Sequence, residues 1–218
     1  MTSFIILAIL VALLIWVLMQ LSRKKDQPEP LAGSLPKPDL ANLKVTDARA
    51  GDMISVSGAG DDFSDLDFKA DHYTRFDAGA HPWVELSGPY RERTVSLRIA
   101  EREGIESDEI DVAVRKDPRK LTLEDLGLAE EDLAQMDERQ NTSDSFEFDG
   151  KVWYYRRSRE VRAWRDGQTS RPTAFYYWEF REQDGKRLLT VRKLEGEPFA
   201  VGLYTEIPAG DVTVYRGR

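Results

Sequence analysis

The sequence predicts a mainly β protein, an antiparallel barrel or a two-sheet sandwich with one short helical insertion, preceded by a transmembrane helix. Three observations lead to this fold class. Short segments of alternating apolar and polar residues recur from residue 43 onward, Asp-Gly and similar sequences separate them, and an apolar run occupies the amino terminus. At 218 residues the chain has room for a membrane segment and one sizeable domain.

Residues 2–21 are predicted to form the transmembrane helix. The run "FIILAILVALLIWVLM" starts at Phe4, and at about 1.5 Å per residue the whole stretch reaches about 30 Å, the thickness of the hydrocarbon core. A cleaved signal peptide would need cations before the run and a small-residue cleavage site after it, and neither is present. The cations instead follow, as Arg23, Lys24 and Lys25, which predicts an outside amino terminus and a cytoplasmic body.

Residues 22–42 are predicted to be a basic flank and a Pro-rich linker. Four of the ten prolines fall between residues 26 and 42. Polyproline II at about 3.1 Å per residue would let this linker reach about 50 Å from the membrane. A spacer is the simpler interpretation, and a docking motif for a proline-binding module is the alternative.

The domain over residues 43–218 is predicted to be a series of strands joined by tight turns. In "TVSLRIA", Val95, Leu97 and Ile99 alternate with polar residues, as in a strand with one buried face. Asp-Gly pairs supply the positive φ of hairpin turns, and closely joined hairpins give antiparallel sheet. The other predicted strands are MISV from 53, DFKADHY from 67, PWVELS from 82, IDVAV from 110, SFEF from 145, and then KVWYY, REVRAW, TAFYYWEF, RLLTV, FAVGLY and VTVY.

Residues 120–140 are predicted as the helical insertion. Thr122 and Asp125 are placed as a capping pair, and Gly127 should weaken the helix or split it into two short pieces. The apolar residues near helical spacing are Leu123, Leu126, Leu133 and Met136.

The segments on either side of this insertion, 43–117 and 144–218, are faintly alike. A constant offset of 94 residues without gaps places Glu85, Leu86, Arg93, Leu97 and Arg98 on Glu179, Phe180, Arg187, Val191 and Arg192. If the chain is duplicated, each half is a small curled sheet and the helix crosses between them. Strand hairpins also resemble one another by chance, so both interpretations stay open.

The segment 58–68, "GAGDDFSDLDF", is the candidate ligand or partner surface. Its four acids are Asp61, Asp62, Asp65 and Asp67. An EF-hand loop would need oxygen ligands at alternate positions and a closing glutamate, which this segment does not provide. If the following strand alternates, Leu66 and Phe68 point inward and Asp65 and Asp67 point outward. Asp61 and Asp62 would then bond turn amides. An ordered turn, a ligand or partner surface and a metal site are the three interpretations.

No catalytic, cofactor or metal site is predicted. The chain has two histidines, His72 and His81, and no cysteine, whereas zinc usually needs three or four nitrogen or sulfur ligands. No nucleophile elbow or Gly-rich phosphate loop occurs. The segment 153–165, "WYYRRSREVRAWR", interleaves five arginines with four aromatics, which fits ion-paired surface arginines, anionic headgroup contact or stacked nucleic acid bases.

The charge of the chain disfavours nucleic acid as a partner. The formal net charge is −8, and without the first 25 residues 28 basic and 39 acidic residues give −11. Phosphate binding depends on neutralisation by Lys and Arg, which an acidic domain does not supply in excess. The arginine-rich segment is therefore interpreted first as surface arginines paired with nearby acids.

The motifs "AGDMISVSGAGDDFSDLDF", "PWVELSG" and "FYYWEFREQDGKRLLTVRKLEG" resemble a bacterial family catalogued as domain of unknown function 4178 (DUF4178). The likeness covers about residues 43–216, and the Asp-rich turn with the Trp-x-Glu-Leu hairpin is its most specific part. The resemblance implies a bacterial origin and a β-rich domain, in some proteins membrane-attached, with links to envelope-stress or polyamine-related gene neighbourhoods. It implies no catalytic residues.

These observations predict a single-pass protein of the bacterial inner membrane whose cytoplasmic β domain is a non-catalytic binding or scaffolding module. Its expected partners are the lipid bilayer, through residues 2–21, and a membrane or membrane-associated protein, without nucleic acid or cofactor. The alternative function is an enzyme, or a module dependent on a metal or polycation, that acts through the Asp-rich turn over residues 61–67.

Overall fold

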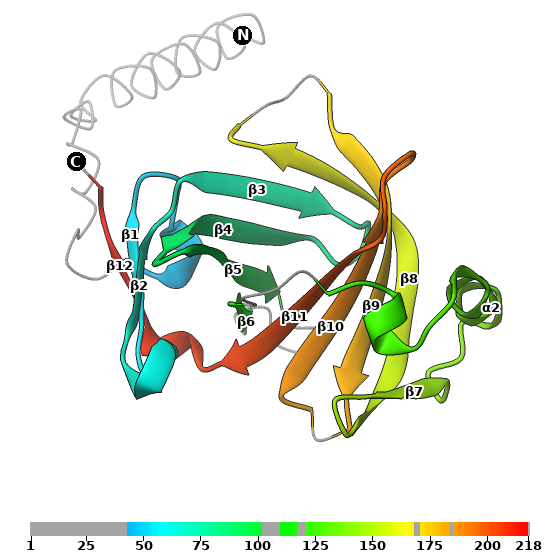
Figure 1. Cartoon of the computed structure of the whole chain (residues 1–218). Coiled ribbons are helices and arrows are strands. Elements are labelled where there is room, and N and C mark those ends of the chain that lie inside the picture. Colours follow the sequence, from blue (N-terminus) through cyan, green and yellow to red (C-terminus); the bar gives the residue numbers. More distant parts are fainter. Residues whose placement is uncertain (1–42, 102–109, 117–120, 168–170, 184, 218) are drawn as a thin grey trace, which may run out of the picture. The chain divides into compact units, whose positions relative to one another are not determined.

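The computed structural model describes residues 43–101, 110–116, 121–167, 171–183 and 185–217. Eight antiparallel strands form a barrel in the order β3-β4-β5-β6-β11-β10-β9-β8, and the pairing of β8 with β3 closes it (Figure 1). Of the two predicted arrangements, the barrel is therefore confirmed. Its strands are β3 (His72–Asp77), β4 (Trp83–Tyr90), β5 (Arg93–Glu101), β6 (Ile110–Arg115), β8 (Lys151–Arg165), β9 (Thr173–Glu182), β10 (Arg187–Lys193) and β11 (Ala200–Ile207).

Two Asp-Gly pairs have the left-handed backbone that the sequence predicts. Asp149 and Gly150 have φ of 54° and 66° and form a two-residue hairpin turn just before β8, and Asp166 and Gly167 have φ of 51° and 76° just after it. Two short strands were predicted between these turns, but β8 runs through both as one strand of 15 residues. It is long enough to pair with β3 near one end and with β7 (Ser145–Phe148) near the other.

The outer face of β4, β5 and β6 is apolar and is covered by a second sheet. This sheet has the order β12-β1-β2, with β1 (Met53–Val56), β2 (Leu66–Lys69) and β12 (Val212–Tyr215). Gly88 of β4 permits the close crossing, because a Cβ atom there would lie 1.8 Å from the Lys69 carbonyl oxygen. The buried side chains of this interface include Ile54, Val56, Leu66, Phe68, Val214, Leu86, Leu97, Ile99, Val112 and Val114.

The outer face of β8, β9 and β10 is covered by helix α2 (Glu130–Arg139) and the turns that precede it. Trp178 Nε1 donates a hydrogen bond to the Leu133 carbonyl at 3.1 Å, and Asp137 accepts hydrogen bonds from Tyr176 and Ser158. The buried apolar side chains of this layer include Leu126, Leu133, Met136, Trp153, Tyr155, Phe180, Leu189 and Val191. Each of these two outer faces thus buries an apolar cluster.

The predicted helical segment is split, as the glycine indicates. Gly127 has a left-handed φ of 67° between the 3-10 turn η3 (Glu124–Leu126) and α2. Thr122 and Asp125 form the predicted capping pair, with the Thr122 N–H donating to Asp125 Oδ2 at 2.7 Å and the Asp125 N–H donating to Thr122 Oγ1 at 3.2 Å. The other 3-10 turns are η1 (Val45–Asp47), η2 (Asp61–Phe63) and η4 (Ala209–Asp211).

The predicted transmembrane helix over residues 2–21 and the linker over residues 22–42 lie outside the described residues. Among the described residues, no helix combines the length and the apolar composition that crossing a bilayer requires. The membrane anchor therefore stays a prediction.

Replacing Asp137 with Ala should loosen α2 from the barrel. We expect the free energy of unfolding to fall by about 1–3 kcal/mol, because the Ser158 and Tyr176 hydroxyls lose their shared acceptor. Burial and the Asp137 hydrogen bond raise the pKa of Tyr176 to about 12, so this pKa should fall toward the ordinary value of 10.0 in the variant. Urea denaturation and an NMR titration of the tyrosine rings measure both effects.

Glu138→Ala is the control for this change, because Glu138 is an exposed acid on the same helix. An equal loss of stability in both variants would contradict a specific role for the Asp137 carboxylate.

Candidate functional site

The interior of the barrel contains a cavity of about 480 Å³. Its walls come from β4, β5, β6, β8, β9, β10 and β11 and from the loop between β3 and β4, so it lies within the ring of strands. Trp83, Tyr177 and Leu188 supply apolar surface, and arginine and carboxylate side chains supply most of the rest. A volume in this range suits a small organic molecule.

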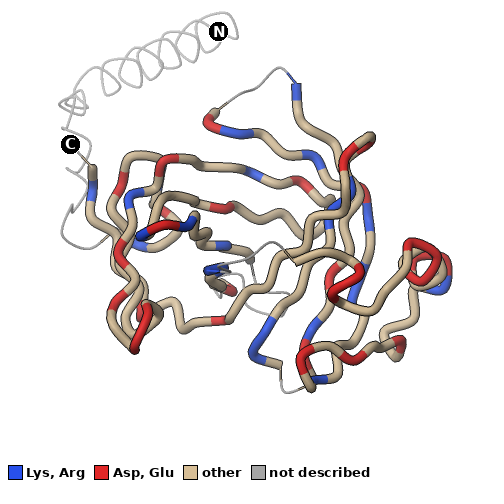
Figure 2. Tube along the Cα trace, in the orientation of Figure 1, with Lys and Arg blue, Asp and Glu red and all other residues tan. Residues whose placement is uncertain are grey.

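A β-bulge in β8 aims several arginines into this cavity. The pairing of β8 with β9 shifts between Tyr155 and Arg157, so Arg156 is the extra residue. Tyr155 packs in the outer apolar layer, whereas Arg157 and Arg159 line the cavity together with Arg156. A regular strand would alternate these residues between its two faces, so the bulge brings neighbouring cations to one side. Lysines and arginines are blue along the strands in Figure 2.

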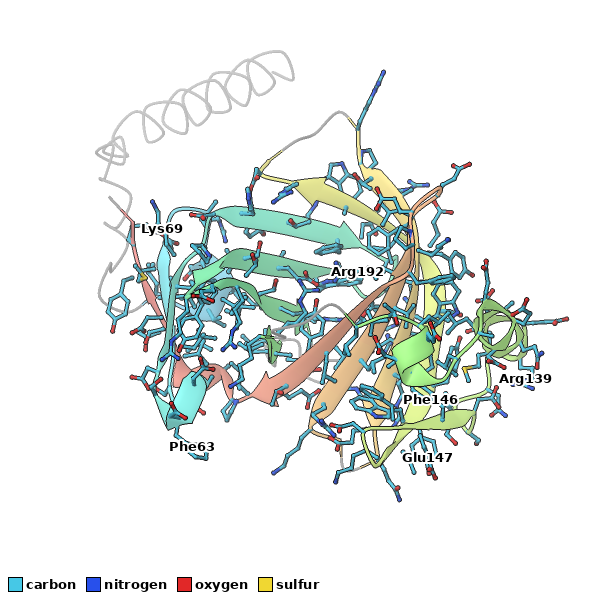
Figure 3. The ribbon with its side chains drawn as sticks, in the orientation of Figure 1. Phe63, Lys69, Arg139, Phe146, Glu147 and Arg192 are labelled. Atoms are coloured by element: carbon cyan, nitrogen blue, oxygen red, sulfur yellow. The ribbon has the colours of Figure 1, made fainter. Side chains whose placement is uncertain are left out.

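Two buried ion pairs cross the barrel interior beside the cavity, and we call their four residues the central ion cluster: Glu85, Arg98, Glu179 and Arg192. Arg98 Nη2 of β5 lies 3.1 Å from Glu179 Oε2 of β9, and Arg192 Nη2 of β10 lies 2.5 Å from Glu85 Oε1 of β4. Neither β4 and β10 nor β5 and β9 are neighbours in the sheet. The pairs therefore connect opposite walls, and Figure 3 shows Arg192 inside the barrel.

Aromatic side chains add hydrogen bonds to this cluster. Trp83 Nε1 and Tyr204 OH donate to Glu85 Oε1 at 3.1 Å and 3.0 Å, and Tyr177 OH donates to Glu179 Oε2 at 3.1 Å. The Arg98 guanidinium also stacks over the Trp83 ring at 4.5 Å. Each buried charge thus has several partners, as a stable buried ion pair requires.

The cluster holds its carboxylates in the charged form. Burial alone would raise the pKa of Glu85, but nearby arginines, above all Arg192, outweigh burial and leave the pKa below its ordinary value. Burial would likewise raise the pKa of Glu179, but the charge of Arg98 and other nearby arginines lowers it overall. Burial would lower the pKa of Arg98, but Tyr177 and Glu179 raise it overall. The interior is therefore strongly ionic at neutral pH.

The Asp-rich turn lies apart from the cavity, on the second sheet. Asp61 accepts hydrogen bonds from Arg91 Nη1 at 2.7 Å and from Arg93, and these arginines lower the pKa of its carboxyl, the Arg93 hydrogen bond most. Asp65, and not Asp61, bonds a turn amide: its Oδ1 accepts the Gly58 N–H at 3.0 Å. The sequence predicts that Asp61 and Asp62 bond turn amides. Asp61 differs, because Arg91 of the β4–β5 turn and Arg93 at the start of β5 bond its two carboxylate oxygens.

The strand after the turn follows the predicted alternation. Leu66 and Phe68 are buried, and Asp65 and Asp67 are exposed. Phe63, beside the exposed Asp62, is 94 % exposed and projects away from the barrel (Figure 3). Asp62 and Phe63 both have positive φ, 55° and 61°. The four acids therefore do not converge on one point.

The two histidines lie in different places. His72 Nδ1 is 2.8 Å from Asp166 Oδ2 at the seam between β3 and β8, whereas His81 lines the cavity. No group of three or more His, Asp or Glu side chains in the described part of the chain is placed to hold a metal ion. The predicted absence of a cofactor stays a prediction.

Sequence reasoning did not identify the cavity or the central ion cluster as a site. Arg98 was placed on the polar face of its strand, but that face points into the barrel and Arg98 is 8 % exposed. The offset of 94 residues matches Glu85 with Glu179 and Arg98 with Arg192. This match is the sequence signal from which the central ion cluster could have been predicted. The two hairpins are not identical in register, because Glu85 faces Arg98 whereas Glu179 faces Thr190.

The fold and the cavity define a closed antiparallel β-barrel with an ionic interior. No protein-family model, no curated protein and no solved structure matches the chain. The resemblance to DUF4178 stays a prediction.

Replacing Arg192 with Met should strongly destabilise the barrel. We expect the free energy of unfolding to fall by about 3–5 kcal/mol, because Glu85 would keep a buried charge without its main partner. Adding Glu85→Gln should recover part of the loss, since it removes that charge. Chemical denaturation followed by tryptophan fluorescence measures both variants.

Arg162→Met is the matched control, because Arg162 is an exposed arginine of β8. A loss below about 1 kcal/mol for Arg192→Met, similar to that of a surface substitution, would contradict the central role of the cluster.

Proposed function

We propose that the chain is a non-catalytic binding module whose barrel takes up a small organic molecule. The observation that carries this proposal is the interior cavity of about 480 Å³, which combines aromatic surface with convergent charged groups. Unlike catalysis, ligand binding within a barrel requires neither a metal ion nor a nucleophile. It needs a walled space and fixed polar groups, and both are present.

The pKa directions of Glu179 and Arg98 support binding over acid–base catalysis by these two residues. A general acid or base works best with a pKa near the operating pH. The cluster instead lowers the pKa of Glu179 and raises that of Arg98, both of which line the cavity, so each is further from neutrality than usual. These groups suit the fixed recognition of charge.

We further propose that residues 2–21 anchor the module in a bacterial inner membrane, with the amino terminus outside and the barrel in the cytoplasm. The apolar run, the following cations and the Pro-rich linker support this arrangement. Membership of the DUF4178 family and a membrane-associated protein partner belong to the same proposal. The likeness of the two halves, with their crossed ion pairs, supports an internal duplication of the barrel.

The alternative function, an enzyme or a metal- or polycation-dependent module acting through the Asp-rich turn, has less support. Asp61 is already paired with two arginines, and Asp65 is bonded to the Gly58 amide. A surface that binds a partner fits this turn better than a metal or catalytic site, because the apolar Phe63 is exposed beside Asp62.

Filling the cavity should abolish ligand binding. Ala100 of β5 lines the cavity opposite Trp83 and Asp111 in the register of the sheet, and Ala100→Phe would occupy part of its volume. We expect compounds that raise the melting temperature of the full chain in a small-molecule screen to lose this effect in the variant. Ala134→Phe on the exposed side of α2 is the control. Hits that persist in Ala100→Phe would place the binding site elsewhere.

The proposed orientation predicts the behaviour of reporter fusions. Alkaline phosphatase fused after residue 40 should be inactive, and green fluorescent protein fused at the same point should be bright, because this point would lie in the cytoplasm. Activity of the phosphatase fusion would reverse the orientation. A chain that lacks residues 2–21 should leave the membrane fraction.

A further inference from the structure

We propose that the ligand of the interior cavity is an organic anion whose carboxylate or phosphate group is held by the arginines of the β8 bulge, Arg156, Arg157 and Arg159. This inference rests on the proposed binding function and adds the chemical class of the ligand. Three features of the cavity carry it: its charge, the bulge and its aromatic wall.

Positive charge exceeds negative charge among the described residues that line the cavity. The five cations are Arg98, Arg156, Arg157, Arg159 and Arg181, and the three carboxylates are Asp111, Glu179 and Glu206. This leaves an excess of two positive charges, although the whole chain carries −8. Within low-dielectric walls such an excess attracts an anion.

The carboxylates of the wall are already engaged by its arginines. Glu179 pairs with Arg98 at 3.1 Å and with Arg157 at 3.5 Å. Glu206 pairs with Arg181, which also lies 3.9 Å from Asp111. A cationic ligand would have to compete with these arginines for every acid, whereas an anion would face five arginines and three acids. The arginines are engaged as well, since Arg159 Nη1 donates to the Ala78 carbonyl at 2.9 Å, but they outnumber the acids.

The bulge concentrates planar donors on one strand. Arg156, Arg157 and Arg159 are three of four successive residues and all line the cavity, which regular alternation would not allow. All five cations of the wall are arginines and none is lysine. The guanidinium fork matches two oxygens of a carboxylate or phosphate, so this choice favours an oxyanion.

The aromatic side chains of the cavity wall indicate that the ligand also has an apolar part. Trp83 and Tyr177 line the cavity, and their rings lie 5.1 Å apart with a tilt of 37°. Leu188 and Ala113 extend this surface. These side chains are almost fully buried, with Trp83 3 % and Tyr177 1 % exposed, so they form a fixed apolar floor against which the body of an organic acid can pack.

Four probes with one ring and different head groups test the inference: benzoate, phenyl phosphate, benzamide and benzylamine. Their binding to the full chain in detergent is measured by ligand-observed NMR and by calorimetry. We expect benzoate or phenyl phosphate to bind, and the stronger of the two identifies the head group. Arg156→Gln should weaken that binding about tenfold, and Arg156→Lys should weaken it less because it keeps the charge.

Arg162→Gln is the control, because Arg162 is an exposed arginine of the same strand and does not line the cavity. If benzamide or benzylamine binds more tightly than the anions, and Ala100→Phe removes that binding, the binding function stands and the anion inference fails. If none of the four probes binds at millimolar concentration, both fail. Equal weakening by Arg156→Gln and Arg162→Gln also overturns the assignment to the bulge.

Discussion

The ion pairs that cross the barrel, Glu85 with Arg192 and Arg98 with Glu179, are the constraint on which the rest of the structure depends. A buried charge is tolerated only with close partners and further hydrogen bonds, and here Trp83 and Tyr177 help to supply them. Since charged and aromatic side chains fill the interior, many aliphatic side chains of the same strands point outward. Those outer faces are stable only under cover, which the β12-β1-β2 sheet and α2 provide.

Most elements of the fold could be predicted from the sequence, because alternation and turn chemistry are local. The strand at Val95, Leu97 and Ile99, the Asp-Gly turns and the split at Gly127 all follow from residues close in the chain. Alternation shows that a strand has two different faces, but not which face lines a closed barrel. Arg98 was therefore assigned to the polar side correctly, while its burial at 8 % exposure could not be predicted.

The candidate site was harder to predict because its residues are joined only by barrel closure. Arg98 and Glu179 are 81 residues apart, and nothing local to either predicts an ion pair. The bulge at Arg156 likewise could not be predicted, because no residue type in this arginine-rich and aromatic segment marks a bulge. The composition of the Asp-rich turn predicts a site, yet its acids are dispersed, and the apolar Phe63 beside them is 94 % exposed.

Glu179 belongs both to the fold and to the proposed site, and this limits how the site can change. Its carboxylate holds Arg98 of the central ion cluster and lies 3.5 Å from Arg157 of the bulge, so any substitution there would disturb the stability of the barrel together with the proposed ligand recognition. Arg156 lines the same cavity but is exposed and lies outside the central ion cluster. The proposed specificity can therefore vary at Arg156 at little cost in stability, whereas Arg157 and the central ion cluster are coupled through Glu179.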